Sequence, residues 1–316
     1  IITSFNFQSM SRRLCETAQV DESVPPAEFK LSKALTRVFG VGMLLNLGGR
    51  IYRDKFCDLF THNKTDHSAI PGEISADLAE IVQCCVQLKV ETHGDFPKLG
   101  EEERGIAMAN HPSDELVWPW TNIIAQKITP RLKAIAKKEL LYDPKALPPI
   151  FGWLGKLSEL MIMVDRSNRD TSVKSIRESC KTIFKPGTAV CIFPDGHRPT
   201  RESIARSHAE MADKGYPDLP ETMPYTCFPK SGGLLTILRA TEGHRTRILN
   251  TTVGLSADEN GPDVLGSTAH VYGEEVEREA LVGKSSSAEE QERCLKQWLV
   301  AEWKRKNNMI NGWRAA

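Results

Sequence analysis

The chain has 316 residues, with 41 lysines and arginines balanced by 41 aspartates and glutamates, so its formal net charge is zero. A chain of this length can bury a substantial core and is expected to form one large domain or two smaller ones. Apolar residues make up 40% and charged residues 26%, which is typical of a globular protein in water. The zero net charge gives no support to a global polyanion-binding role, so no nucleic acid is expected as a partner.

Residues 1–85 are expected to form a helical N-terminal element, with a helix start at Ser75, where acids follow a polar cap. No apolar stretch approaches the roughly 20 residues that a membrane-spanning helix needs. The longest candidate, residues 38–47, is flanked by basic residues between Lys33 and Lys55. Two interpretations stay open: a helix lying on an anionic membrane surface, or a core helix with a solvated basic face.

From residue 86 onward, short strands alternate with helices, which favours an α/β sheet covered by helices over residues 86–316. Strands are predicted at residues 88–92, 105–109, 132–136, 160–164, 189–193, 225–228, 248–255 and 269–272. Helices are predicted at residues 115–128, at 170–184 with Asp170 as N-cap, and at 285–306.

The cysteines predict free thiols. There are eight, none in a Cys-x-x-Cys pair, and Cys180, Cys191 and Cys227 lie inside apolar runs. This usage is typical of a reducing compartment such as the cytoplasm rather than of a disulfide frame. No metal site is expected, because no cluster of His, Cys or Asp has the spacing of metal ligands.

Four polar segments follow in a meaningful order, the first three directly after predicted strands. They are residues 110–115 with a histidine and two carboxylates, 164–169 and 193–198 with arginines, and 227–233 with a lysine. A phosphate-bearing substrate and a proton transfer would need residues of these types at neighbouring strand ends.

His111 is the candidate general base, because histidine titrates near neutrality and can accept a proton from an alcohol. A carboxylate on its other ring nitrogen would fix the tautomer and stabilise the imidazolium. Asp114 and Glu115 are both candidates for that carboxylate. No Gly-x-Ser-x-Gly motif is present, so direct attack by a substrate hydroxyl is favoured over a covalent enzyme intermediate.

Arg166 and Arg198 offer planar donor forks that suit phosphate. Asp165 and Asp195 are expected to orient these guanidiniums or to accept a hydrogen bond from a substrate hydroxyl. Gly196 lets the backbone approach a ligand closely. The alternative is that these residues form ordinary surface Asp–Arg pairs, but their repeated placement at strand ends argues against it.

The order of these segments resembles that of the glycerolipid acyltransferase superfamily, which includes the 1-acylglycerol-3-phosphate acyltransferases of the lysophospholipid branch. Residues 110–115 resemble the family's first block, a histidine box written His-x4-Asp. Residues 164–166 resemble the second block, and residues 193–198 the third, commonly Phe-Pro-Glu-Gly-Thr-Arg. Residues 228–233 resemble the fourth block. The resemblance covers roughly residues 86 to 255.

The chain departs from the family pattern at two blocks. The residue five after His111 is Leu116, so the usual aspartate position is empty. Glu115 takes that position if one residue is missing from the box, whereas Asp114 matches a variant that reads Asn-His-x-Ser-Asp. The third block has aspartate in place of glutamate and His197 in place of threonine.

The resemblance implies a mixed α/β sheet covered by helices, as in glycerol-3-phosphate acyltransferases. It implies acyl transfer from a thioester donor, acyl-CoA or acyl-carrier protein, to a hydroxyl of a phosphorylated glycerol lipid such as lysophosphatidate. No cofactor beyond that donor is implied. His111 would be the general base, oriented by Asp114 or Glu115. A lipid acceptor also implies peripheral contact with a membrane surface.

The same resemblance implies an acceptor pocket. Arg166 and Arg198 would hold the phosphate, Asp195 and Gly196 would shape the pocket, and Lys230 would add charge at its edge. Three alternatives stay open: transfer to an amine or soluble acceptor, a non-catalytic lipid- or acyl-carrier-binding protein, and a thioesterase-like hydrolase.

Overall fold

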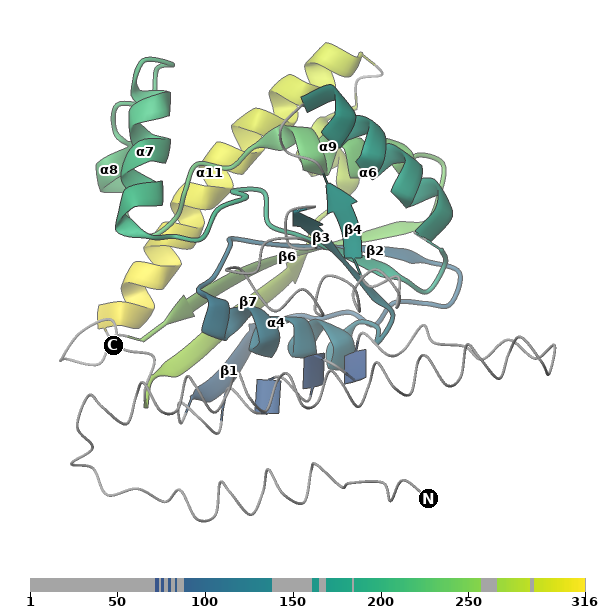
Figure 1. Cartoon of the computed structure of the whole chain (residues 1–316), viewed down its shortest axis with the longest axis horizontal. Coiled ribbons are helices and arrows are strands. Elements are labelled where there is room, and N and C mark those ends of the chain that lie inside the picture. The colour runs from purple at the N-terminus through teal and green to yellow at the C-terminus, as the bar shows by residue number, and fades with distance from the viewer. Residues whose placement is uncertain are drawn as a thin grey trace.

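A seven-stranded mixed sheet forms the centre of the described part of the chain, in the order β1-β7-β6-β2-β5-β3-β4 (Figure 1). The strands are β1 (Lys89–Gly94), β2 (Arg104–Ala109), β3 (Leu132–Lys137), β4 (Met161–Val164), β5 (Ala189–Ile192), β6 (Thr246–Leu255) and β7 (Thr268–Glu275). Neighbouring strands are parallel except for β6 and β7, which are antiparallel. The mixed α/β fold implied by the sequence is therefore confirmed.

This structure is a computed structural model that describes residues 88–137, 161–164, 169–183, 185–256, 266–284 and 287–315, with isolated positions between 72 and 83. Its helices are α4 (Asp114–Lys127), α6 (Arg169–Ile183), α7 (Arg201–Ala212), α8 (Leu219–Thr222), α9 (Ser231–Ala240), α10 (Arg278–Val282) and α11 (Ala288–Ala315). The basic-flanked segment at 38–47 lies outside the described residues. None of the described helices has the length and apolarity to cross a membrane.

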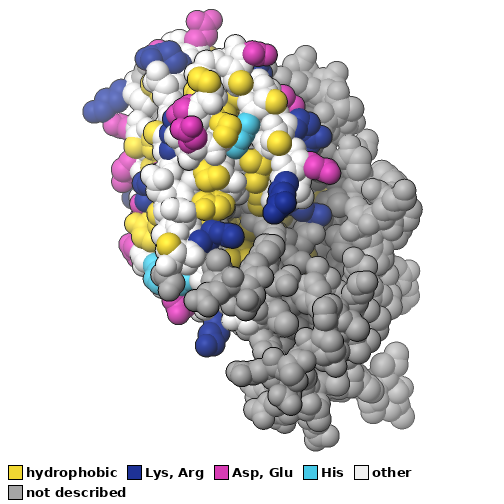
Figure 2. All heavy atoms as spheres, turned by 90° about the vertical axis from the view of Figure 1, so that its left-hand side faces the viewer, with side chains coloured by type: hydrophobic (Ala, Val, Ile, Leu, Met, Phe, Trp, Pro, Cys, Tyr) yellow, Lys and Arg dark blue, Asp and Glu magenta, His cyan; other side chains and the backbone are white. Residues whose placement is uncertain are grey.

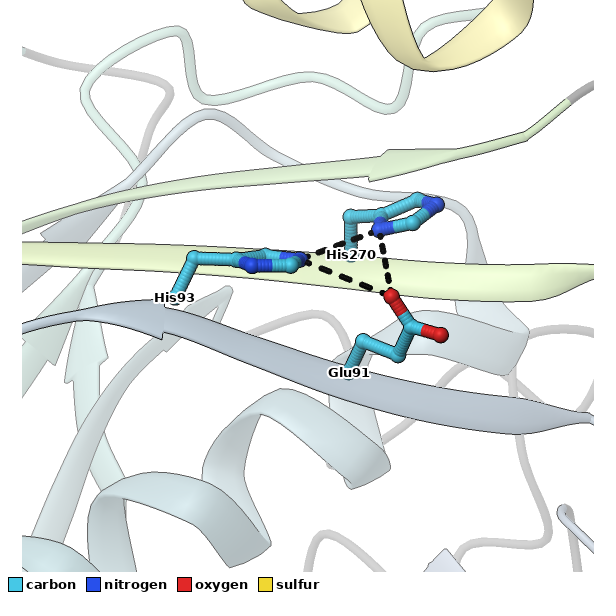
Figure 3. A group of neighbouring side chains, drawn as sticks. All are labelled: Glu91, His93 and His270. Atoms are coloured by element: carbon cyan, nitrogen blue, oxygen red, sulfur yellow. Dashed lines mark hydrogen bonds and ion pairs between the residues drawn. The ribbon is translucent and has the colours of Figure 1, made fainter. Parts of the chain in front are cut away.

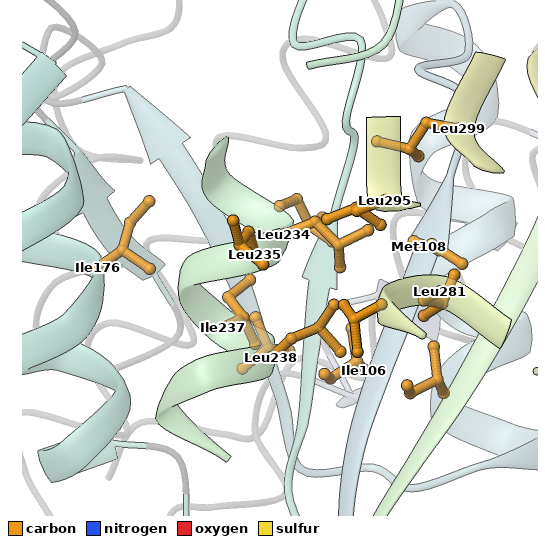
Figure 4. Packing of buried hydrophobic residues seen from close by; sticks show 14 of the residues in the cluster. Ile106, Met108, Ile176, Leu234, Leu235, Ile237, Leu238, Leu281, Leu295 and Leu299 are labelled. Carbon is orange, nitrogen blue, oxygen red and sulfur yellow. The ribbon is translucent and has the colours of Figure 1, made fainter. Parts of the chain in front are cut away.

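Two hydrophobic cores lie on opposite faces of the sheet, because side chains alternate between the faces along each strand. On one face, Leu116 and Trp120 of α4 pack against Ala107 of β2 and its neighbours. On the other face, α6, α9, α10 and α11 pack against Ile106 and Met108 (Figure 4). The sheet is thus the middle layer between α4 and the other helices (Figure 1).

Seven of the eight predicted strands and the three predicted helices are present, with shifted ends. The strand predicted at 225–228 is wrong, since these residues form a turn and an extended loop. The N-cap predicted at Asp170 is also wrong, because α6 already begins at Arg169. The helix start predicted at Ser75 is placed too late, because Gly72 and Glu73 are already helical. Helix α11 continues to Ala315, beyond the predicted end at residue 306.

The parallel strands bring the polar segments together. Strands β2, β4 and β5 run in the same direction, so their carboxyl ends lie at one edge of the sheet. The loops that follow β2 and β5 carry His111 and Asp195. Loops at the carboxyl ends of parallel strands are the usual position of ligand sites in α/β folds.

Candidate functional site

The loop after β2 holds His111 in a defined orientation. The Asn110 side chain extends the pairing of β2 with β6, donating to the Val253 carbonyl and accepting its N–H, both at 2.9 Å. Nδ1 of His111 lies 2.8 Å from the carbonyl oxygen of Pro112. A carbonyl can only accept, so Nδ1 carries the proton and the neutral ring has its lone pair on Nε2. The half-buried imidazole also packs against Phe193, with ring centroids 4.5 Å apart.

Asp195 joins the loop after β5 to the loop after β2. Its carboxylate oxygens accept the backbone N–H of His111 at 3.0 and 2.8 Å. The residue is 1% exposed, so its described contact is with the protein rather than with solvent. Asp195 is therefore placed to position His111, and its predicted role in shaping the acceptor pocket stays a prediction.

Burial raises the pKa of Asp195 to about 7, because a carboxylate loses its hydration inside the protein. The His111 N–H, the Trp303 indole, the Lys306 ammonium and the Gly196 N–H each favour the charged form and limit this rise. The Trp303 indole N–H is outside normal hydrogen-bond geometry to any described acceptor, so it acts as a dipole at longer range. Asp195 therefore gains or loses its proton close to neutral pH.

Lys306 of α11 is fully buried. Its ammonium donates a hydrogen bond to the Thr251 carbonyl and lies 4.8 Å from the centroid of the Trp303 ring. Burial lowers the pKa of Lys306 to about 8, while Glu302 and Asp195 act in the opposite direction. Lys306 and Asp195 are thus both buried, and the charge of each favours the charged form of the other.

The two candidate carboxylates for His111 lie at the start of α4. Asp114 is the first residue of the helix and Ser113 is its N-cap, although the Ser113 side chain makes no capping hydrogen bond. The side chains of Asp114 and Glu115 lie outside the described part of the structure. Both residues remain candidates, and the described partner of the His111 ring nitrogen is the Pro112 carbonyl.

The third and fourth segments meet, because the backbone N–H of Lys230 donates to the Pro194 carbonyl at 2.9 Å. Gly196 has a φ of +67°, a conformation that favours glycine. Arg198 and Lys230 are exposed. Lys230 is also the N-cap of α9, whose Gly232 has open space around its backbone. This edge of the sheet thus combines exposed cations with a helix N-terminus, both of which favour anions.

The second segment, residues 164–169, lies at the end of strand β4. Strand β4 ends at Val164, at the same edge of the sheet as the loops with His111 and Asp195. Asp165 and Arg166 follow it but lie outside the described residues. Their roles remain predictions.

An open groove of about 510 Å³ lies along α7 and α8. Ile204, Ala205 and Ala209 line it, with Arg201 at one end, and hydrophobic side chains gather over these helices in Figure 2. Helix α7 is tied to the site loops, because Ser203 donates to the Arg198 carbonyl and Ser207 accepts the Phe228 N–H at 2.8 Å. The groove therefore adjoins the third and fourth segments.

The sequence prediction missed Trp303 and Lys306, which lie far beyond the recognised segments. A signal was present, since Leu295, Leu299, Trp303 and Ile310 mark the apolar stripe of α11. Lys306 falls in that stripe at helical spacing, where a solvated lysine is not expected. A charged residue in a core stripe indicates a buried partner, but not which one.

The described cysteines are free thiols. Cys180, Cys191 and Cys227 are buried, as predicted. Burial raises the pKa of Cys180 to about 11 and that of Cys191 to about 12. Thiols with such values stay protonated at neutral pH and are poor nucleophiles, which agrees with a site based on histidine.

A comparison with protein families finds a match in the part of the chain that carries the four segments. Residues 87–240 match the family model described as Acyltransferase. This segment is therefore similar to the acyltransferases of the glycerolipid superfamily.

Two further comparisons agree with this similarity. The 1-acyl-sn-glycerol-3-phosphate acyltransferase gamma proteins of Homo sapiens and Pongo abelii are each 24% identical over 184 residues, which is 57% of this chain. The chain spans 45% of the length of these relatives. The crystal structure of the 1-acyl-sn-glycerophosphate (LPA) acyltransferase PlsC from Thermotoga maritima has the same fold, with a TM-score of 0.50 and 13% identity. That match covers 89% of this chain and 97% of the other.

Proposed function

We propose that this protein transfers an acyl group from a thioester donor, acyl-CoA or acyl-carrier protein, to a hydroxyl of a phosphorylated glycerol lipid such as lysophosphatidate. The observation that carries the proposal is the joining of the His111 loop to Asp195 at the same sheet edge as Arg198 and Lys230. A base beside exposed cations fits an acceptor that carries both a hydroxyl and a phosphate.

In this mechanism, Nε2 of His111 takes the proton of the acceptor hydroxyl as its oxygen attacks the thioester carbonyl. The resulting oxyanion collapses, the C–S bond breaks, and the imidazolium returns the proton to the departing thiolate. The Pro112 carbonyl supports this role because it holds the proton on Nδ1. Asp195 acts as a positioning residue through the backbone of His111.

The acceptor phosphate would bind between Arg198, Lys230 and the first turn of α9, with Arg166 added from the sequence prediction. Charge-assisted hydrogen bonds from a guanidinium suit phosphate oxygens. The open backbone at Gly232 lets helix N–H groups approach the same anion.

The groove along α7 and α8 is proposed to take the acyl chain at the membrane interface. Its volume of about 510 Å³ lies within the roughly 300–1,000 Å³ of typical small-molecule sites. Its lining is mainly apolar, and Arg201 would face anionic headgroups. The basic-flanked segment between Lys33 and Lys55 is proposed as a second point of contact, since each basic residue near an anionic surface adds about 1 kcal/mol.

The direct test incubates the full chain with labelled acyl-CoA or acyl-carrier protein, with and without lysophosphatidate. The proposal expects label in phosphatidate, lost in His111→Ala and kept in His244→Ala, which changes an exposed histidine elsewhere. Release of free fatty acid without transfer would instead support the thioesterase alternative. Binding of the donor without turnover would support a non-catalytic protein, and label in an added amine would support the alternative acceptors.

The membrane contact is tested by flotation with vesicles of increasing anionic lipid content. Binding is expected to rise with anionic lipid and to fall as salt screens the charges. Deletion of residues 31–57 is expected to weaken it. If the full chain fails to bind at low salt, the acceptor is more consistent with a soluble molecule.

A further inference from the structure

Three potential metal ligands lie close together on β1 and β7, the two strands at the side of the sheet opposite to β4. Glu91 and His93 are two residues apart on β1, so their side chains share one face. The register of β1 and β7 pairs Glu91 with His270, which adds the second imidazole to that face. Figure 3 shows the three side chains converging from the two strands. This group is named here the Glu91–His93–His270 cluster.

The distances in this cluster match those around one bound ion. Nε2 of His93 lies 3.2 Å from Nδ1 of His270 and 3.8 Å from a Glu91 carboxylate oxygen, and that oxygen lies 3.5 Å from Nδ1 of His270. A circle through three points with these separations has a radius of about 2.0 Å, and zinc binds His nitrogen and carboxylate oxygen at about 2.0–2.2 Å. An ion at the centre of this circle would therefore lie at bonding distance from all three atoms.

We propose that Glu91, His93 and His270 bind a divalent transition-metal ion such as Zn²⁺. Two imidazoles and one carboxylate are a known zinc ligand set, with a fourth position left for water. The cluster has room for that water, because the Glu91 and His93 side chains are 55% and 42% exposed. His270 is 14% exposed and supplies the buried side of the site.

Neighbouring residues hold His270 in place, as residues next to metal ligands commonly do. The Trp313 ring stacks on His270, with centroids 5.2 Å apart and planes at 18°. Gly254 makes room for this ring, since a Cβ there would come within 2.9 Å of it.

A bound metal ion would hold the edge strand β1 more firmly against β7. Within the described residues β1 pairs with β7, and the ion would add a second link between them at the end of α11. Strand β7 lies two strand spacings from β2 and β1 lies three, or about 10 and 14 Å. The cluster is therefore a structural site in this proposal, independent of the acyl-transfer chemistry.

The experiment uses the full chain without a histidine tag, stripped with a chelator and dialysed. Titration with Zn²⁺ followed by calorimetry and elemental analysis is expected to give one tightly bound ion per chain. When Co²⁺ is used in place of Zn²⁺, we expect the visible absorption bands that are typical of Co²⁺ with four ligands. A Zn²⁺ concentration 100 times Kd is expected to raise Tm by about 5–10 °C, since binding stabilises only the folded state.

His93→Gln and Glu91→Gln change exposed side chains, so both variants are expected to fold. Each is expected to weaken Zn²⁺ binding by more than the roughly 10–100-fold that loss of an outer-layer partner costs. His244→Ala, which changes an exposed histidine outside the cluster, is expected to bind like the unchanged chain. The proposal is overturned if the unchanged chain retains no ion and shows no Zn²⁺-dependent rise in Tm. It is equally overturned if His93→Gln binds as well as His244→Ala.

Discussion

Replacing Asp195 with asparagine should make the protein more stable at alkaline pH and less active. The wild-type carboxylate is buried, and its pKa rises from an ordinary value of 3.8 to about 7. At a pH between these two pKa values, Asp195 keeps its proton in the folded protein but releases it in the unfolded chain. The free energy of unfolding therefore falls as the pH rises through this window. Asparagine carries no charge at any pH, so this decline should disappear.

The size of this stability difference follows from the shift in the pKa of Asp195. About three pH units at 1.36 kcal/mol each give a cost of about 4 kcal/mol above pH 7, and this value already contains the attraction of Lys306. Asparagine offers one oxygen where the carboxylate offers two to the His111 N–H, which costs about 1 kcal/mol. Asp195→Asn is thus expected to match the wild type near pH 4.5 and to exceed it by about 3 kcal/mol at pH 8.

Urea unfolding at pH 5, 6, 7 and 8 measures this difference directly. The matched control is Asp213→Asn, which changes an exposed aspartate at the end of α7 and should follow the wild-type curve. In an acyl-transfer assay on the same samples, turnover of Asp195→Asn is expected to fall, because the His111 loop loses its anionic acceptor. Equal pH slopes for wild type and Asp195→Asn between pH 5 and 7 would refute the reasoning.

Four further changes test other parts of the site. His111→Ala is expected to lower kcat by about 10²–10⁴-fold, with an unchanged circular dichroism spectrum. Arg198→Ala is expected to raise the KM for lysophosphatidate by about 10-fold or more while leaving that of the donor unchanged, since a charge-assisted hydrogen bond contributes about 1.5–3 kcal/mol. Lys306→Met is expected to raise the pKa of Asp195, so that the decline of stability measured in urea continues to a higher pH. Ala209→Asp places a charge in the apolar groove and is expected to reduce flotation with vesicles.

The strands that carry the site could be predicted because each is a short apolar run followed by polar residues. Strand β2 is the clearest case, since five of its six residues are buried. Residues 225–228, which were wrongly predicted as a strand, are also mostly apolar, but their backbone groups do not pair with any of the described strands. The Tyr225 N–H donates to the Asn307 side chain, and the Phe228 N–H donates to Ser207. Side chains of α11 and α7 thus satisfy this backbone in place of a neighbouring strand.

The contacts within the site could not be predicted in the same way. The order of the segments predicted that His111 and Asp195 would both lie at the carboxyl ends of the strands. It did not indicate that Asp195 would accept a hydrogen bond from the His111 N–H. The Glu91–His93–His270 cluster was missed for a related reason. Spacing rules find ligands that are close in sequence, whereas His270 reaches Glu91 only through the register of β1 and β7.

The matched acyltransferase segment is smaller than the unit that must fold to form the site. Residues 87–240 end before β6, yet β6 pairs with β2 and its Val253 holds the Asn110 side chain beside His111. Lys306, also outside the segment, supplies the buried cation that limits the pKa of Asp195. Without β6 and α11, the His111 loop would lose a hydrogen-bonded neighbour and Asp195 would lose its counter-charge. The position of the His111 loop and the pKa of Asp195 therefore depend on residues outside the matched segment.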